Sequence, residues 1–170
     1  LLSCLDEIAW LYNIRGKDIP YNPVVISYAL VSAEQAWLFV KPAKIPAEVK
    51  QALEEAGVEI RDYHHLFLFL EEWKDKKKFC LDTSTLNFAV YNKIAASHEI
   101  ITGRSPVVLW KALKNPTEIA GFRKACQQDG IAMTRFFYWL EQQVGKRTIS
   151  ETEAAEKLTA LRKENPDYIS

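Results

Sequence analysis

Hydrophobic positions in the first hundred residues alternate between strand-like runs and helix-like stretches. Residues 24–32 and 35–40 are rich in β-branched and aromatic side chains, and residues 32–34 between them are short enough for a hairpin turn. Further strands are expected at 58–61, 79–81 and 98–102, and helices at 5–12, 46–57, 64–73 and from 82 or 84 to 94. This alternation predicts an α/β fold, a mixed sheet with helices on both faces.

Cap signals support several of these helix ends. Ser3 and Asp6 have the spacing of a capping box in front of the first helix. Pro46 stands at the first position of the second helix, and Gly57 follows its end, which is the usual asymmetry. Asp82 or Ser84 is expected to cap the fourth helix.

A different pattern begins near residues 105–106. Asn115, Pro116 and Glu118 give an N-cap, a first-turn proline and an acid at the third position. Apolar or small residues then recur three and four positions apart, at Ile119, Phe122, Cys126, Gly130, Met133, Phe137, Leu140 and Val144. The spacing predicts one long helix that ends at Gly145.

Ser150 and Glu153 form another capping box, which opens a helix to about Lys163. Two amphipathic helices without a sheet are an incomplete core. We therefore divide the chain into an α/β domain at 1–104 and the opening of a second, truncated domain at 105–170.

Composition and charge narrow the function classes. The 170 residues are 48% hydrophobic and 26% charged, which are ordinary values for a globular protein. Lys plus Arg and Asp plus Glu are both 22, so no net charge recruits nucleic acid or an anionic membrane. No apolar run approaches the ~20 residues of a membrane-spanning helix. We expect neither nucleic acid nor a membrane as a partner.

The cysteines and histidines form no recognisable metal or nucleophile motif. Cys4, Cys80 and Cys126 are far apart and are expected to be small buried hydrophobes in a reducing compartment. His64 and His65 are expected as a partly exposed pair at a helix start, and His98 stands alone. No glycine-rich phosphate loop is present either.

Three groups of charged residues allow alternative interpretations. Asp6, Asp18, Asp62 and Asp82 could gather at a sheet edge as a nuclease-like metal site, although aspartates that end strands are also common turn and cap residues. Asp6 and Glu7 are neighbours on a helix and so point about 100° apart, which favours a helix N-terminus over an acid–base pair. Residues 74–78 are a basic run, either a solvated turn or a phosphate patch.

The loop at residues 13–23 is the surface segment that most suggests a recognition role. Two prolines restrict it, and it carries Arg15, Lys17, Asp18 and Tyr21 together. It is either a recognition edge or a structural crossover in which Arg15 pairs with Asp18.

Residues 5–24 closely resemble the LDEIAWL-N-RG-D-NPV signature of the Xaa-Pro aminopeptidases, best in their three-domain form. The resemblance continues at 27–29, 111–115, 118–119, 123–125 and 129–130. It departs at Ala125–Cys126, where many relatives have Ala-His. Because Cys126 belongs to the apolar stripe of the long helix, we expect it to be buried and to serve packing.

The resemblance implies that 1–104 is the second of two creatinase/prolidase N-terminal-like domains, and that 105–170 holds the opening helices of a truncated pita-bread metallopeptidase domain. Such enzymes use two divalent metal ions, usually manganese, to remove the N-terminal residue that precedes proline. The family's metal ligands lie downstream of Ser170, so no catalytic, cofactor or metal residue is assigned here. Arg15, Tyr21 and Asn22 are expected near the cleft entrance.

The expected function is therefore a noncatalytic middle segment of a cytoplasmic metallopeptidase, one that scaffolds the active site and restricts access to it. Its expected partners are the remainder of its own chain, peptides with proline in second position, and a second copy in a homodimer. Residues 1–4 are expected to be the tail of a buried strand. The alternative is a free-standing α/β interaction module without enzymatic activity.

Overall fold

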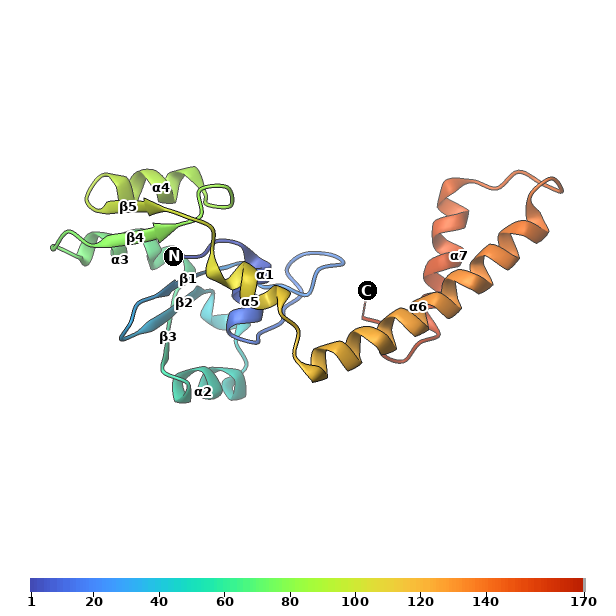
Figure 1. Cartoon of the computed structure of the whole chain (residues 1–170), viewed down its shortest axis with the longest axis horizontal. Coiled ribbons are helices and arrows are strands. Elements are labelled where there is room, and N and C mark those ends of the chain that lie inside the picture. Colours follow the sequence, from blue (N-terminus) through green and yellow to red (C-terminus); the bar gives the residue numbers. More distant parts are fainter. Residues whose placement is uncertain (170) are drawn as a thin grey trace. The chain divides into compact units, whose positions relative to one another are not determined.

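The computed structural model describes residues 1–169. The chain separates into two compact units, the first from Leu1 to Leu113 and the second from Lys114 onward. Figure 1 shows strands only in the first unit, while the second consists of helices. The assignment of 1–104 and 105–170 to two family domains stays a prediction.

The first unit contains two small sheets. In one, β1 (Ser27–Val31) pairs antiparallel with β2 (Ala36–Val40), and β2 pairs parallel with β3 (Val58–Arg61). In the other, β4 (Lys78–Leu81) pairs parallel with β5 (Glu99–Thr102). The helices are α1 (Leu5–Leu11), α2 (Ala47–Glu55), α3 (Leu66–Glu72), α4 (Phe88–Ala95) and α5 (Pro106–Ala112), with short 3-10 turns η1 (Pro42–Lys44) and η2 (Tyr63–His65). The α/β class and its mixed sheet are confirmed.

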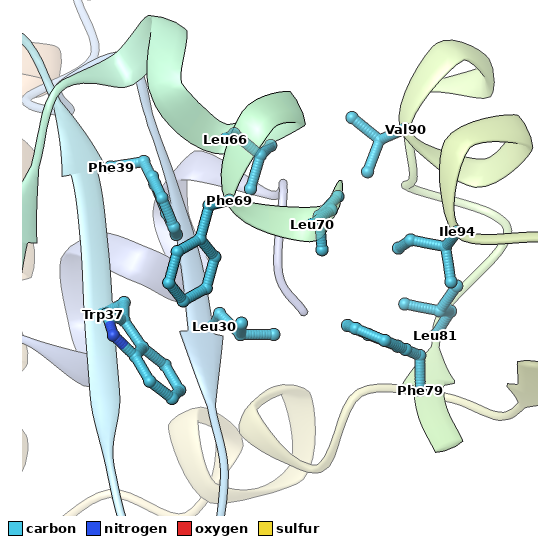
Figure 2. Close-up of a cluster of buried hydrophobic side chains, with 10 residues drawn as sticks. All are labelled: Leu30, Trp37, Phe39, Leu66, Phe69, Leu70, Phe79, Leu81, Val90 and Ile94. Carbon is cyan, nitrogen blue, oxygen red and sulfur yellow. The ribbon is translucent and has the colours of Figure 1, made fainter. Parts of the chain in front are cut away.

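Side-chain alternation along β2 divides the core in two. Trp37 and Phe39 point into a cluster built with α3, α4 and β4 (Figure 2). Leu38 and Val40 point to the opposite face, where they pack with Ile8 of α1 and residues of α2. Because successive strand residues face opposite ways, both faces of the three-stranded sheet are covered by helices, as the sequence predicts.

The strands divide between two sheets, and residues 1 and 2 lie between β1 and β4. Leu2 and Ala29 exchange two backbone hydrogen bonds, of 2.7 and 3.1 Å. The amino group of Leu1 donates to the carbonyl of Cys80 over 3.5 Å. Residues 1 and 2 are therefore extended and occupy a strand-like place in the sheet region.

Two predicted caps are wrong. Ser3 does not cap α1, because its hydroxyl donates to the carbonyl of Thr85 over 2.8 Å. Asp82 does not open α4 either: it holds a turn with Ser84, and the helix starts at Phe88 behind Asn87.

The second unit pairs α6 (Pro116–Gln143) with α7 (Glu151–Lys163). The predicted caps at Asn115 and Ser150 are confirmed. Arg162 binds Asp129 and Arg135 binds Glu164, which join the two helices. None of the helices in residues 1–169 is both long and apolar enough to cross a membrane.

The prediction of buried cysteines is wrong. All three thiols are free; Cys80 and Cys126 are exposed and Cys4 is half-buried. Cys126 stands on the predicted stripe of α6, but Phe122 and Phe137 of the same stripe are also exposed. The α6–α7 pair is too thin to bury the whole stripe.

Candidate functional site

The segment from residue 13 to residue 26, called the 13–26 loop below, forms a narrow projection with a tight turn at its tip. The amide of Asn22 donates to the carbonyl of Ile19 over 3.2 Å. Tyr21 takes a left-handed backbone conformation, with φ of 63°, which is uncommon for a residue with a side chain. The residue is 84% exposed. The turn therefore presents an aromatic side chain to solvent.

The base of the loop is held by its own backbone. Gly16 donates to Pro23 and Asp18 donates to Val24, each over 3.3 Å. A Cβ atom at Gly16 would lie 2.9 Å from both the carbonyl oxygen of Val24 and the Cβ of Val25. The close approach of the two arms requires glycine at this position.

Arg15 anchors the loop to the end of α1. Its Nη1 donates to the carbonyls of Ala9 and Ile14, each over 2.8 Å. A cation at the C-terminal end of a helix is favourable, because the last carbonyls there lack partners within the helix. The predicted alternative, in which Arg15 pairs with Asp18, is wrong.

Asp18 ties the loop to η1. Its Oδ2 accepts from the amide of Ile26 over 2.8 Å, and its Oδ1 accepts from Nζ of Lys44 over 2.6 Å. These hydrogen bonds, that of Lys44 first, hold the pKa of the Asp18 carboxyl below its ordinary value. Sequence reasoning missed Lys44, because it lies far from Asp18 along the chain and stands in no motif itself.

A cavity of about 400 Å³ lies beneath the loop. Its floor is apolar and comes from β2 and α2, through Leu38, Val40, Val49 and Leu53. Charged residues of the loop and η1 stand at its rim: Arg15, Lys17, Asp18 and Lys44. An apolar floor with a mainly cationic rim can hold a small apolar group whose polar end carries negative charge.

The predicted site residues Arg15, Tyr21 and Asn22 all lie in the 13–26 loop but have different structural roles. Arg15 lines the cavity and fixes the base of the loop, whereas Tyr21 lies at the exposed tip beside Asn22. Their place relative to a cleft stays a prediction.

The four aspartates of the nuclease-like hypothesis each bind a separate local partner. Asp6 pairs with Lys111, Asp18 with Lys44, Asp62 accepts from the amide of His64, and Asp82 binds Ser84. Within residues 1–169 no group of three or more His, Cys, Asp or Glu side chains is placed to hold a metal ion.

The remaining titratable candidates also have structural surroundings. Glu7 is buried, unlike its neighbour Asp6, and its Oε2 has no hydrogen-bond partner in the described part of the chain. The ring of His98 is buried between the carbonyl of Leu70 and the amide of Lys77. His64 and His65 are exposed at the start of α3, as predicted.

Comparison with known proteins gives the family. Residues 1–118 match the family described as Creatinase/Prolidase N-terminal domain. The chain is 40% identical to a probable Xaa-Pro aminopeptidase P of Sordaria macrospora, across 99% of this chain and 29% of that protein. The chain therefore spans less than a third of this relative.

Solved structures agree in fold. An X-prolyl aminopeptidase from Caenorhabditis elegans, described as a cytosolic enzyme with a di-nuclear active site, superposes with a TM-score of 0.83 at 28% identity. That match covers 98% of this chain and 28% of the other. An Xaa-Pro dipeptidase from Bacillus anthracis gives 0.64 at 18% identity, over 94% of this chain and 42% of the other, which supports the fold alone. With most of its length matched, this chain belongs to the creatinase/prolidase N-terminal domain family and is a homologue of the Xaa-Pro aminopeptidases.

Proposed function

We propose that this chain is a noncatalytic middle segment of an Xaa-Pro aminopeptidase, a hydrolase that removes an N-terminal residue preceding proline. One observation carries the proposal. The similarity to a probable Xaa-Pro aminopeptidase P runs along 99% of this chain, yet the chain spans only 29% of that protein. The parent protein is then the enzyme, and this segment supports its active site.

The metal centre of the parent enzyme belongs, in this proposal, outside residues 1–170. The related enzyme of Caenorhabditis elegans is described as having a di-nuclear active site, which supports two divalent metal ions in the parent protein; manganese is the expected metal. The side chains here do not fit such a centre, because Asp6, Asp18, Asp62 and Asp82 are bound to separate local partners. No step of the reaction is assigned to them.

The 13–26 loop is proposed to restrict access to the active site of the parent protein. Its base is fixed by Arg15, Gly16 and Asp18, so Tyr21 and Asn22 at the tip are presented by a braced segment. A braced aromatic tip can limit the length or shape of an entering peptide without touching the reacting bond. Arg15, Tyr21 and Asn22 are the residues proposed at the cleft entrance.

The partners and the compartment of the parent protein are part of the same proposal. Its substrates are peptides with proline in second position, and a second copy of the protein is the proposed partner in a homodimer. The cytoplasm is the proposed compartment, since the Caenorhabditis elegans relative is described as cytosolic.

The proposal that catalysis belongs to the parent protein outside residues 1–170 is tested by comparing the 170-residue chain with the full-length protein. Each is titrated with Mn²⁺ in a calorimeter and then assayed for hydrolysis of Ala-Pro-Ala. We expect metal binding and turnover by the full-length protein only. Stoichiometric, tight Mn²⁺ binding or turnover by the 170-residue chain contradicts the noncatalytic assignment.

The loop's role is tested by Tyr21→Ala in the full-length protein. This change removes the exposed ring and leaves the bonds of Arg15 and Asp18 intact, so we expect KM or the preferred peptide length to change. Phe88→Ala, at another exposed aromatic residue of the first unit, is the matched control. Arg15→Ala also releases the loop from α1; unchanged turnover and affinity in both loop variants refute the access role.

A further inference from the structure

The cavity beneath the 13–26 loop has an aliphatic interior. It measures about 400 Å³, and every apolar residue that lines it is aliphatic. Leu38, Val40 and Leu53 of its floor are buried members of one hydrophobic cluster. Val25 and Val49 pack against the same cluster. An occupant therefore meets a firm apolar floor without hydrogen-bonding side chains, which suits a hydrocarbon chain.

The rim of the cavity keeps positive charge because its acid is already paired. Asp18 and Lys44 bind each other over 2.6 Å, so their charges offset one another. Lys17, also at the rim, has no ion-pair partner among residues 1–169. The guanidinium group of Arg15 binds uncharged backbone carbonyls. Arg15 and Lys17 together therefore favour an anion at this edge of the cavity.

Arg15 has one edge of its guanidinium group left for that anion. Its hydrogen bonds to the carbonyls of Ala9 and Ile14 both use Nη1. Nε and Nη2 have no acceptor in the described part of the chain, and their N–H groups lie side by side on the planar group. Two parallel N–H groups match the two oxygens of a carboxylate. The free edge of Arg15 therefore selects a carboxylate.

The first turn of α2 borders the same cavity, through Pro46 and Val49. No side chain caps this helix, whose N-cap residue is Pro46. Its first amides lack partners within the helix, and the positive end of the helix dipole lies at the border of the cavity. Glu48 is the acid of this turn, but it does not line the cavity. The helix end thus adds to the positive potential of the rim.

We propose that this cavity is a binding site for a free aliphatic carboxylate, the anion of a medium-chain carboxylic acid. Nε and Nη2 of Arg15 hold the carboxylate beside Lys17, and the hydrocarbon chain lies on the floor of the cavity. The C-terminal residue of a peptide also carries a carboxylate, but its amide groups would lose water against this floor without gaining partners. The site does not depend on the proposed function.

A bound carboxylate connects the loop to the sheet beneath it. Its head lies on residues of the loop, while its chain lies on β2 and α2. The base of the loop is closed by the amides of Gly16 and Asp18, which donate to Pro23 and Val24. Because a ligand stabilises the state that binds it, we expect these amides to exchange more slowly when the site is filled. The ligand thereby controls how firmly the loop is held.

The test begins with a titration of sodium octanoate into the 170-residue chain with isotope-labelled Leu and Val methyl groups. We expect saturable shifts at Val49 and Leu53 with a Kd below about 1 mM. Acetate has the same head without the chain, and octyltrimethylammonium has the same chain on a cation; neither should bind. Acetyl-Ala-Leu, which carries a peptide carboxylate, should bind at least about tenfold more weakly than octanoate.

Three variants locate the site. Arg15→Lys keeps the charge and loses the paired N–H groups, so Kd should rise at least about tenfold. Lys17→Gln should raise Kd about threefold, whereas Lys50→Gln, the same change on α2 outside the cavity, should not alter it. Val49→Phe fills the cavity and should abolish binding. Lys17→Gln and Val49→Phe leave the bonds of Arg15 intact, so they remain informative if Arg15→Lys loosens the loop.

The same titration is then followed by calorimetry in the full-length protein, where a similar Kd is expected. No saturable shift, equal binding of octylammonium and octanoate, or tighter binding of acetyl-Ala-Leu overturns the proposal. A Kd in the full-length protein that Lys17→Gln leaves unchanged belongs to another site and overturns it as well. These readouts need neither peptidase activity nor a metal ion, so they succeed or fail independently of the proposed function.

Discussion

Gly16 lies where the two arms of the 13–26 loop approach most closely. A Cβ atom there would meet the carbonyl oxygen of Val24 and the Cβ of Val25 at 2.9 Å, and the first of these is backbone that cannot swing away. We expect Gly16→Ala to cost about 1–3 kcal/mol, since one added methyl group forces the arms apart. Urea unfolding measures the loss.

Gly130 provides the matched control for this substitution. It lies inside α6, and nothing outside its own helix is within 4 Å of a built Cβ. Gly130→Ala should therefore stabilise α6 by about 0.5–1 kcal/mol, because alanine loses less backbone entropy in a helix. Equal effects of the two changes would contradict the steric role of Gly16.

Asp18 makes the stability of the loop depend on pH. Its pKa is lowered in the folded state, first by Lys44, so the unfolded chain binds a proton more readily as the pH falls. The contribution is thus complete above the ordinary pKa of 3.8 and is lost as pH falls through the lower folded value. We expect Asp18→Asn to destabilise the chain by at most about 1 kcal/mol near neutral pH, because Lys44 is partly exposed.

The measurement is urea unfolding at about pH 7 and about pH 3. The difference in free energy of unfolding between wild type and Asp18→Asn should be smaller at the lower pH. Lys44→Met should produce a similar loss at neutral pH, while Lys50→Met, at an exposed lysine of α2, should not. A difference that persists in acid argues against the ion pair.

At the scale of the element, α6 depends on a reciprocal cap. The Asn115 side chain accepts from the amide of Glu118, and the Glu118 carboxylate accepts from the amide of Asn115, each over 2.8 Å. We expect Asn115→Ala to destabilise the helix by about 1 kcal/mol, whereas Asn115→Asp should retain most of the cap. Thermal unfolding followed by circular dichroism compares the two; equal loss in both would mean that the cap oxygen contributes nothing.

The elements that sequence reasoning located best are those whose signals are local. β3 was expected at 58–61 and lies at Val58–Arg61, and the caps of α6 and α7 stand where their sequence spacing places them. Failures arise where a side chain finds a distant partner instead. Ser3 binds Thr85 rather than capping α1, and no pattern near Ser3 indicates that contact.

The candidate site follows the same rule. The 13–26 loop was identified from its prolines and charged residues, which are local features. Its bracing was not, because Asp18 binds Lys44 of η1 and Arg15 binds the carbonyls at the end of α1. The cavity beneath the loop was missed as well, since its floor comes from β2 and α2. Only packing across the fold reveals it.

At the scale of the whole molecule, the two units differ sharply in how much they bury. Both hydrophobic clusters lie within residues 1–113. Among the described residues of the second unit, the buried hydrophobic side chains are Ala132 and Leu161 alone. Area removed from water is the main favourable term in folding, so a helix pair with so little of it is marginal.

This contrast predicts that the 170-residue chain unfolds in two steps. We expect amides of α6 and α7 to exchange faster than those of β1 and β2, and brief thermolysin treatment to cleave within residues 114–169 first, leaving 1–113 intact. Leu161→Ala should accelerate that cleavage, whereas Leu53→Ala, in the core of the first unit, should not. Exchange at one common rate throughout the chain would show that the two units unfold together, in which case the thin packing of α6 on α7 does not limit stability.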